Sequence, residues 1–182
     1  ISHASTGSTS FDGTDDYIDI GTALSYTNHT VCAWVNLDDN SDTKIILDTR
    51  DSSVDGVLFY ANSSETIAYK LNGSVLTTSS SYANQWIFVA CSYDGTTQKL
   101  YVNGSLEEST TTSQTISTTT NAIIGARSFT SQNQFFDGKM CNVGLWNRAL
   151  SASEVQGIMY KQYADLGSVD KASLVSWWGL DE

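Results

Sequence analysis

Two polar segments carry the side chains best suited to binding a carbohydrate. They are residues 48–55 and 126–134, which lie between stretches typical of β-strands. A sugar is held by an aromatic ring against its C–H face and by planar polar side chains at its hydroxyl groups. Function tends to gather on loops held by a rigid scaffold, so these segments and one neighbouring strand form the predicted ligand site. The candidate binding residues are Asp55, Tyr60, Arg127, Phe129, Asn133 and Gln134, with Asp51, Gln132 and Phe135 nearby.

Arg127 has two interpretations within this predicted site. It could form an ion pair with Asp55 inside the fold, or its guanidinium could recognise a carboxylate or sulfate on an acidic glycan. Of the two, we expect the ion pair between Arg127 and Asp55.

Catalytic side chains are not arranged in any recognisable set. The two histidines, His3 and His29, have no nucleophile motif around them. Glycoside hydrolysis needs two carboxyl groups flanking the scissile bond. The five glutamates do not supply such a pair along one strand, because Glu107 and Glu108 fall in a polar tract and Glu154 begins a helix. The sequence therefore predicts a protein that is not an enzyme.

A cation site near Asp12 and Asp137 is the metal hypothesis that the residues themselves suggest. Each aspartate follows a phenylalanine and precedes a glycine, and the two strands carrying them could lie close together. Carboxylate oxygens are ligands that calcium prefers. The competing interpretation, which we favour, is that both Asp-Gly pairs simply form turns.

Composition and charge narrow the classes of protein and partner. The chain has 182 residues, 40% of them hydrophobic, which suits one large β-sandwich domain over residues 1–182. Its net charge of −11 argues against binding nucleic acid or an anionic membrane. No apolar run reaches membrane-spanning length, so membrane insertion is not expected. The chain begins at Ile1, which suggests a mature protein or a piece excised from a longer chain.

Short β-rich segments at steady spacing indicate an antiparallel sandwich. Asn72-Gly73, Asp94-Gly95 and Asn103-Gly104 are typical hairpin turns, and proline is absent. The predicted fold is all-β, a two-sheet antiparallel jelly-roll sandwich. The expected strands cover residues 30–36, 44–47, 56–61, 67–71, 75–77, 86–93, 99–102, 122–125 and 173–180.

Residues 138–155 predict a strand that runs into a short helix. Alternation places Met140, Asn142 and Gly144 on one side of the strand, and Cys141 and Val143 on the other. Ser151 and Glu154 have the spacing of a capping box, which predicts one short helix near residues 152–162.

The ordered set of these motifs resembles the concanavalin A-like jelly rolls, specifically their laminin-G-like and pentraxin branch. The resemblance covers nearly the whole chain, and it is the order of the motifs that makes it specific. The residues that carry it are Phe11-Asp12-Gly13, Thr30-Val31-Cys32-Ala33-Trp34, Val89-Ala90-Cys91-Ser92-Tyr93, Leu100-Tyr101-Val102-Asn103-Gly104, Asn142-Val143-Gly144-Leu145-Trp146 and Leu174-Val175-Ser176-Trp177.

The resemblance implies a disulfide bond and a compartment. Pentraxins join the two matching strands by a disulfide, which here would be Cys32–Cys91 and would imply an oxidising environment. The alternative is that both are buried free thiols acting as small hydrophobes. Cys141 would remain a free buried thiol in either case.

Calcium is the cofactor that the resemblance suggests. Asp55 matches one pentraxin ligand position, and Asn133 and Gln134 could supply further oxygens. The second ligand loop departs from the family, because Ala126, Arg127 and Ser128 stand where acids and amides are expected. An arginine opposes a divalent cation, which argues against the double calcium site of pentraxins.

Three functions follow as expectations. A non-catalytic, lectin-like glycan-binding module, extracellular or on the surface of a virion or cell, comes first. A structural or adhesion module, such as a virion or tail-fibre domain that contacts proteins or cell surfaces, is the alternative, and an enzyme comes last. Pentraxins form rings, so the resemblance makes an oligomer conceivable.

Overall fold

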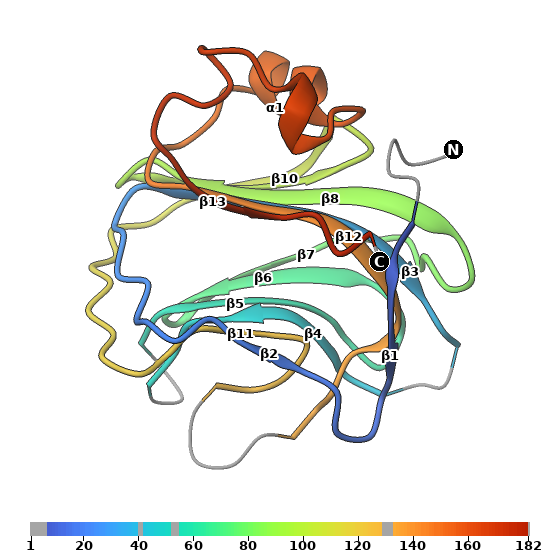
Figure 1. Cartoon of the computed structure of the whole chain (residues 1–182). Helices are drawn as coiled ribbons and strands as arrows, with labels where there is room; N and C mark the ends of the chain where they lie inside the picture. The colour runs from blue at the N-terminus through green and yellow to red at the C-terminus, as the bar shows by residue number, and fades with distance from the viewer. Residues whose placement is uncertain (1–6, 40–41, 52–54, 129–132, 182) are drawn as a thin grey trace.

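Two antiparallel β-sheets lie face to face in the computed structural model, which describes residues 7–39, 42–51, 55–128 and 133–181. Within these residues one sheet has seven strands, ordered β1-β12-β3-β8-β9-β10 with β13 also paired to β12. The other has six, ordered β2-β11-β4-β5-β6-β7. Figure 1 shows the two layers, with the helix α1 on the outer side of the seven-stranded sheet. The predicted two-sheet antiparallel jelly roll is therefore confirmed.

The strands of the seven-stranded sheet are β1 (Thr9–Asp12), β3 (His29–Leu37), β8 (Trp86–Tyr93), β9 (Thr97–Val102), β10 (Ser105–Thr111), β12 (Asp137–Trp146) and β13 (Leu174–Trp178). Those of the six-stranded sheet are β2 (Ile18–Asp19), β4 (Lys44–Asp48), β5 (Val57–Ala61), β6 (Ile67–Leu71), β7 (Ser74–Thr77) and β11 (Ile123–Ile124). Two Asn-Gly turns close the hairpins β6–β7 and β9–β10, with Asn72 and Asn103 both at φ 50°. Asparagine tolerates this left-handed conformation, which is why these turns could be predicted.

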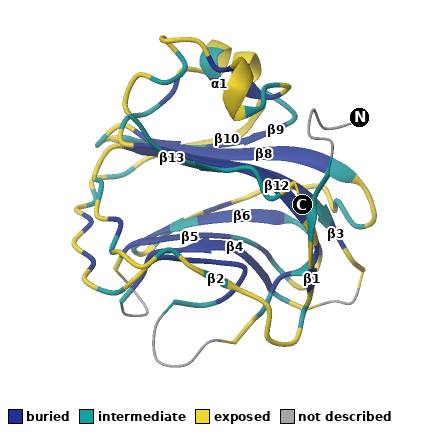
Figure 2. Ribbon diagram, viewed as in Figure 1, coloured by how far each residue is buried: buried dark blue, intermediate teal, exposed yellow. Residues whose placement is uncertain are grey.

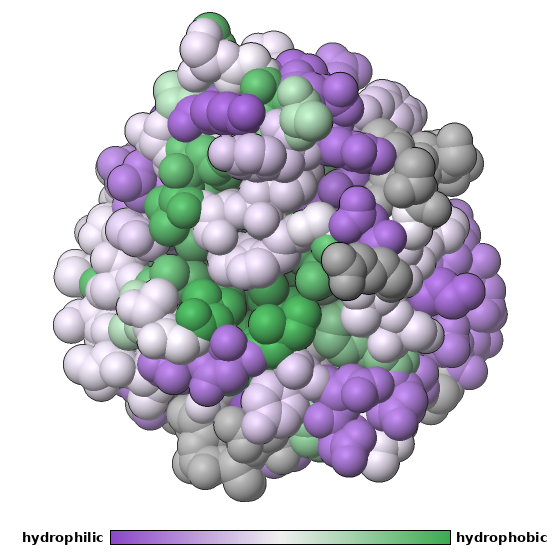
Figure 3. All heavy atoms as spheres, viewed as in Figure 1, coloured by the Kyte–Doolittle hydropathy of each residue, from purple (hydrophilic) through white to green (hydrophobic). Residues whose placement is uncertain are grey.

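The main hydrophobic core fills the space between the sheets. Val31 and Val89 from one sheet and Phe59 and Tyr69 from the other are at most 1% exposed. Figure 2 shows that the strands of both sheets are mainly buried. On the face drawn in Figure 3, hydrophobic atoms gather along the open edge between the two layers. Burial of apolar area of this kind is the main driving force for folding.

A second, smaller core lies on the outer side of the seven-stranded sheet. Here α1 (Ala152–Ile158) buries Val155 and Ile158 against Trp34 and Trp146 of the sheet. Ser151 is the N-cap and forms the predicted capping box with Glu154. The helix ends at Ile158 rather than near residue 162, because the chain then turns into a short 3₁₀ segment, η1 (Tyr163–Asp165). No helix among the described residues has both the length and the apolar character needed to cross a membrane.

The strict alternation predicted for β12 is wrong at Asn142. The register with β3 shifts between Cys141 and Gly144, and Asn142 adopts φ 51°, which marks a β-bulge. As a result Met140 and Val143 both face the main core, while Cys141 faces the helix side. A bulge adds one residue to a strand and reverses every later side chain, so periodicity alone could not reveal it.

The predicted Cys32–Cys91 disulfide is wrong. All three cysteines are buried free thiols. In the β3–β8 ladder Cys32 lies opposite Ala90, and Cys91 lies opposite Val31. Adjacent residues of a strand point to opposite faces, so Cys91 enters the main core while Cys32 enters the helix-side core. The two sulfur atoms are thus separated by the sheet itself, and the inference of an oxidising compartment loses its support.

Candidate functional site

A buried ion pair at the end of β4 organises the first predicted segment. Asp48 is 0% exposed, and its two carboxylate oxygens accept hydrogen bonds from Nε and Nη2 of Arg50 at 2.8 and 2.9 Å. The same carboxylate accepts the backbone N–H of Arg50 at 3.0 Å. Such bidentate geometry is the strongest form of this contact. This pair was not predicted, although an Asp-x-Arg directly after a buried apolar strand is a signal for it in the sequence.

The two predicted segments are joined at this ion pair. Ser128 donates its backbone N–H to Asp48 Oδ2 at 3.1 Å and its hydroxyl to the carbonyl of Arg50. Thr120 donates its hydroxyl to the same carbonyl at 3.1 Å. The structure therefore joins the start of the first predicted segment, at Asp48 and Arg50, to Ser128 of the second.

Tyr60 lies close to this cluster from β5. It is half-buried, and burial raises the pKa of its phenol while the nearby positive charge of Arg50 opposes that shift. The phenol is consequently neutral at physiological pH and keeps its hydroxyl proton for hydrogen bonding.

The other predicted binding residues lie along the second segment. Arg127 is half-buried, and its backbone N–H donates to the carbonyl of Asn133 at 3.0 Å. Asp55, Asn133 and Gln134 are exposed. Phe129 and Gln132 lie outside the described residues. The Asp55–Arg127 ion pair stays a prediction.

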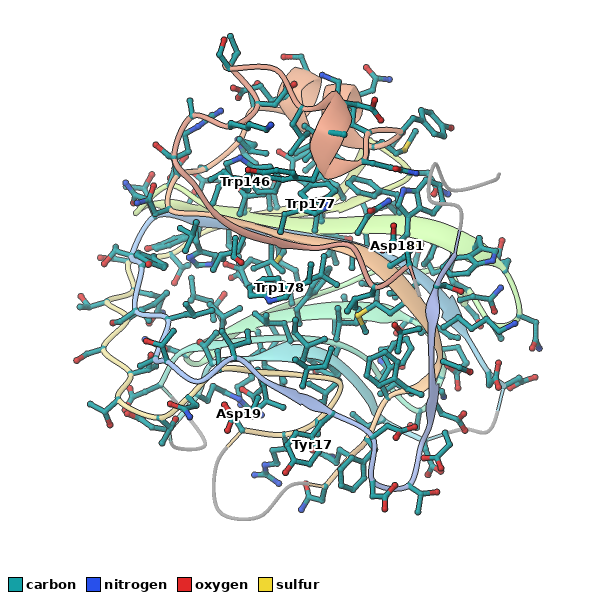
Figure 4. The ribbon with its side chains drawn as sticks, viewed as in Figure 1. Tyr17, Asp19, Trp146, Trp177, Trp178 and Asp181 are labelled. Atoms are coloured by element: carbon teal, nitrogen blue, oxygen red, sulfur yellow. The ribbon has the colours of Figure 1, made fainter. Side chains whose placement is uncertain are left out.

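A cleft of about 440 Å³ opens at the same end of the molecule, and we call it the loop cleft. One of its lining residues, Gln134, belongs to the predicted set. Phe135 beside it packs near Tyr17, with ring centroids 6.5 Å apart, and Tyr17 is 44% exposed. Figure 4 shows Tyr17 at this end of the sandwich, away from the helix. The lining residues are Gly13, Asp42, Thr43, Ser63, Gln134 and Phe135.

Acidic side chains gather beside the loop cleft. Asp12 and Asp137 are direct partners in the β1–β12 ladder, so the expectation that their strands lie close is confirmed. Carboxylate oxygens of Asp12, Asp15 and Asp16 lie within 4.8 Å of one another, and all three residues are exposed. Two of these groups already accept backbone N–H donors within the turn, at 2.8 and 3.0 Å.

This acidic turn has the donor chemistry that calcium prefers but supplies fewer groups than calcium usually takes. Calcium binds six to eight oxygens, and three aspartates with Asp137 nearby would need water or further carbonyl oxygens to complete the set. The hydrogen bonds within the turn equally satisfy the Asp-Gly turn interpretation. The calcium hypothesis therefore stays a prediction, with Asp12, Asp55 and Asp137 as its residues.

Comparison with known families agrees with this architecture. A family model described as the concanavalin A-like lectin/glucanases superfamily matches residues 12–156. This range includes most of the strands and the start of α1. The chain belongs to this superfamily, as the ordered motifs predicted. No significant match is found among curated protein sequences.

Solved structures show the same fold at low sequence identity. A Bacteroides ovatus protein to which carbohydrate binding is attributed superposes with a TM-score of 0.76 at 19% identity, covering 98% of this chain and 52% of that one. This chain thus spans about half the length of that protein. The heptameric SAP-like pentraxin of Limulus polyphemus gives 0.66 at 18% identity, covering 95% and 91%. The CBM40 module of a Ruminococcus gnavus sialidase gives 0.63 at 14% identity, covering 81% and 98%.

Proposed function

We propose that this chain is a non-catalytic glycan-binding module whose site is the loop cleft. The observation that carries the proposal is the combination of side chains there. Phe135 supplies an aromatic surface, and Asp42, Thr43, Ser63 and Gln134 supply hydrogen-bonding groups around a cleft of about 440 Å³. This volume lies in the range of small-ligand sites. The Bacteroides and Ruminococcus neighbours are described as carbohydrate-binding, which supports the same class of ligand.

Charge narrows the ligand to a neutral glycan. The cleft is lined by Asp42, and the exposed carboxylates of Asp12, Asp15 and Asp16 flank its residue Gly13. Like charges repel, so sialylated or sulfated sugars would approach this surface at a cost. Carboxylates instead accept hydrogen bonds from sugar hydroxyl groups. An extracellular or surface location suits such a ligand and is part of the proposal.

The test is a glycan array probed with the whole chain, once with calcium and once with a chelator. We expect binding to neutral glycans, and its loss on chelation would show that binding requires a divalent cation. Phe135→Ala should weaken binding, whereas Tyr160→Ala changes an exposed tyrosine outside the loop cleft and should not. An array without any binding in either condition, or full binding by Phe135→Ala, would overturn the proposal.

An adhesion module is the second candidate, and one feature favours it. Ile18, Ile20, Val175 and Leu180 pack half-buried against the main core, and Figure 3 shows hydrophobic atoms exposed along the open edge of the sandwich. Apolar surface of this kind marks contact sites for proteins. Sedimentation of the chain over a range of concentrations would reveal self-association through this edge. A strictly monomeric chain would contradict the idea that this edge binds a second copy.

A further inference from the structure

A second cleft lies beside the helix-side core, and we call it the helix-face cleft. It has a volume of about 370 Å³. Figure 4 shows Trp177 between the seven-stranded sheet and the segment that carries α1, and Asp181 just beyond the end of β13. The lining residues are Asn142, Gln162, Tyr163, Ala164, Trp177, Gly179 and Asp181. None of them belongs to the loop cleft.

Trp177 differs from the other tryptophans of this core in its hydrogen bonding. Trp34 donates its indole N–H to the carbonyl of Met159, and Trp146 donates to the carbonyl of Asp170, both at 2.6 Å. The indole nitrogen of Trp177 is buried and has no partner in the part of the chain that the structure describes. Tryptophan N–H groups usually find an acceptor when buried, so this donor calls for one.

Asn142 supplies a second donor of the same kind. It occupies the β12 bulge at φ 51° and is 2% exposed. Its Nδ2 group is buried without a hydrogen-bond partner among the described residues. β-Bulges frequently re-aim a side chain next to a binding site. The two orphaned donors therefore belong to residues that line one cleft.

Two glycines leave room for the groups around these donors. A Cβ at Gly144 would lie 2.8 Å from the Trp146 ring and 2.9 Å from the Trp177 ring. A Cβ at Gly179 would lie 2.9 Å from Oδ1 of Asp181. Trp146 and Trp177 meet edge to face with ring centroids 6.0 Å apart. A larger residue at position 144 or 179 would therefore crowd the Trp177 ring or the Asp181 carboxylate.

We propose that the helix-face cleft is a second binding site for a neutral pyranose ring. The donor nitrogens of Asn142 and Trp177 are closed to solvent in the structure, so the cleft walls must part for the oxygens of a sugar to accept from them. The hydroxyl groups of the sugar can donate to the carboxylate of Asp181. The ring of Tyr163 is 54% exposed and has Lys171 Nζ over one face, 4.2 Å from its centroid, so it can offer only the opposite face to the C–H bonds of the sugar. Asp181 and the net charge of −11 disfavour an anionic ligand. The proposal rests on these residues and holds whether or not the loop cleft binds a glycan.

The indole resonance of Trp177 provides the direct test. The five tryptophans of the chain, labelled with ¹⁵N, give five indole signals, and Trp177→Phe identifies the one at issue. The probes are the methyl glycosides of glucose, galactose and N-acetylglucosamine at millimolar concentrations. We expect at least one to shift the Trp177 signal, because its N–H gains an acceptor, while the Trp34 and Trp146 signals stay in place. If no glycoside moves the Trp177 signal, the proposal is overturned.

Two exposed tyrosines provide a matched pair of variants. Tyr163→Ala removes an aromatic wall of the cleft and should weaken the probe's affinity by about 2- to 10-fold. Tyr160→Ala removes a tyrosine of the same 54% exposure outside the cleft and should leave the affinity unchanged. Equal affinity of wild type and Tyr163→Ala would contradict the proposal.

A second pair of variants separates the two clefts. Asn142→Asp replaces the amide donor by a carboxylate of the same shape and should abolish the shift of the Trp177 signal, with folding checked by circular dichroism. Phe135→Ala changes the loop cleft and should leave this shift intact. Loss of the shift in Phe135→Ala would mean that the glycan acts through the loop cleft, which would overturn the helix-face site and leave the proposed function standing.

Discussion

The two sheets of this sandwich are stabilised by different forces outside the apolar core that they share. On the seven-stranded sheet, α1 and the segment after it bury an apolar core around Trp34 and Trp146. At the two ends of β4 in the six-stranded sheet, ion pairs replace apolar packing: Lys44–Glu65 at 2.9 Å and Arg50–Asp48 at 2.8 Å. Every one of these four charged side chains is at most 5% exposed. Charged groups thus position the predicted ligand segments, whereas hydrophobic contacts position the helix.

The largest expected effect comes from breaking the buried ion pair beside the predicted segments. Asp48→Ala leaves the Arg50 guanidinium buried without its carboxylate, and we expect a loss of about 3–5 kcal/mol in the free energy of unfolding. The measurement is urea unfolding followed by tryptophan fluorescence. Asp48→Ala combined with Arg50→Met should recover part of this loss. If Asp48→Ala alone were as stable as wild type, the Asp48–Arg50 pair would not stabilise this end of β4.

Acid should weaken the contact between the sheets through His29. This residue is buried, its ring accepts from the Tyr69 hydroxyl at 2.6 Å across the core, and burial lowers its pKa from 6.5 to about 4. Because the unfolded state takes up the proton first, stability is complete above pH 6.5 and falls as the pH drops toward 4. The pKa difference corresponds to about 3 kcal/mol once both states are protonated. The free energy of unfolding, measured from pH 7 to 5 before most carboxylates titrate, should fall as the pH drops. His29→Gln should reduce this fall.

The polar cap of the helix should matter less than either buried group. Glu154 accepts from Arg148 and from the backbone and hydroxyl of Ser151, each at 2.8 Å, and these contacts lower its pKa from 4.5 to about 2. Its contribution is present above pH 4.5 and is lost as the pH falls toward 2. The group is partly solvated, so Glu154→Ala should cost only ~1 kcal/mol in thermal unfolding. Glu154→Gln keeps the capping box and should cost less than Glu154→Ala.

The smallest expected effect is the change in melting temperature on adding a reducing agent. Cys32 and Cys91 are free and lie on opposite sides of the β3–β8 ladder. Burial raises the pKa of the Cys32 thiol to about 12, so it should react slowly in the folded state. We expect the same melting temperature with and without dithiothreitol, and three reactive thiols only after denaturation. A melting temperature that drops on reduction would restore the disulfide.

Local chemistry made much of this fold predictable from the sequence. The capping box at Ser151, the Asn-Gly hairpin turns and the buried strands depend on neighbouring residues, and all are observed. The disulfide and the alternation of β12 failed because both depend on register, which one bulge or a shift of one residue reverses.

The candidate sites were harder to predict from the sequence than the fold. Segments 48–55 and 126–134 were both predicted as ligand loops, but the Asp48–Arg50 pair that joins the start of the first to Ser128 of the second was not predicted. The helix-face cleft combines Asn142, Gln162, Trp177 and Asp181, which are separated by up to 39 positions and meet only through the bulge and the turn after α1. Nothing in the spacing of these residues marks them as neighbours.

The most direct test of the proposed function is an amide chemical-shift map of the ¹⁵N-labelled chain titrated with the same neutral methyl glycosides. Glycan binding in the loop cleft predicts shifts at Gly13, Thr43, Ser63 and Phe135, which come from four separate segments and meet only there. A titration in which none of these amides moves for any glycoside would contradict the assignment of the loop cleft as the glycan site.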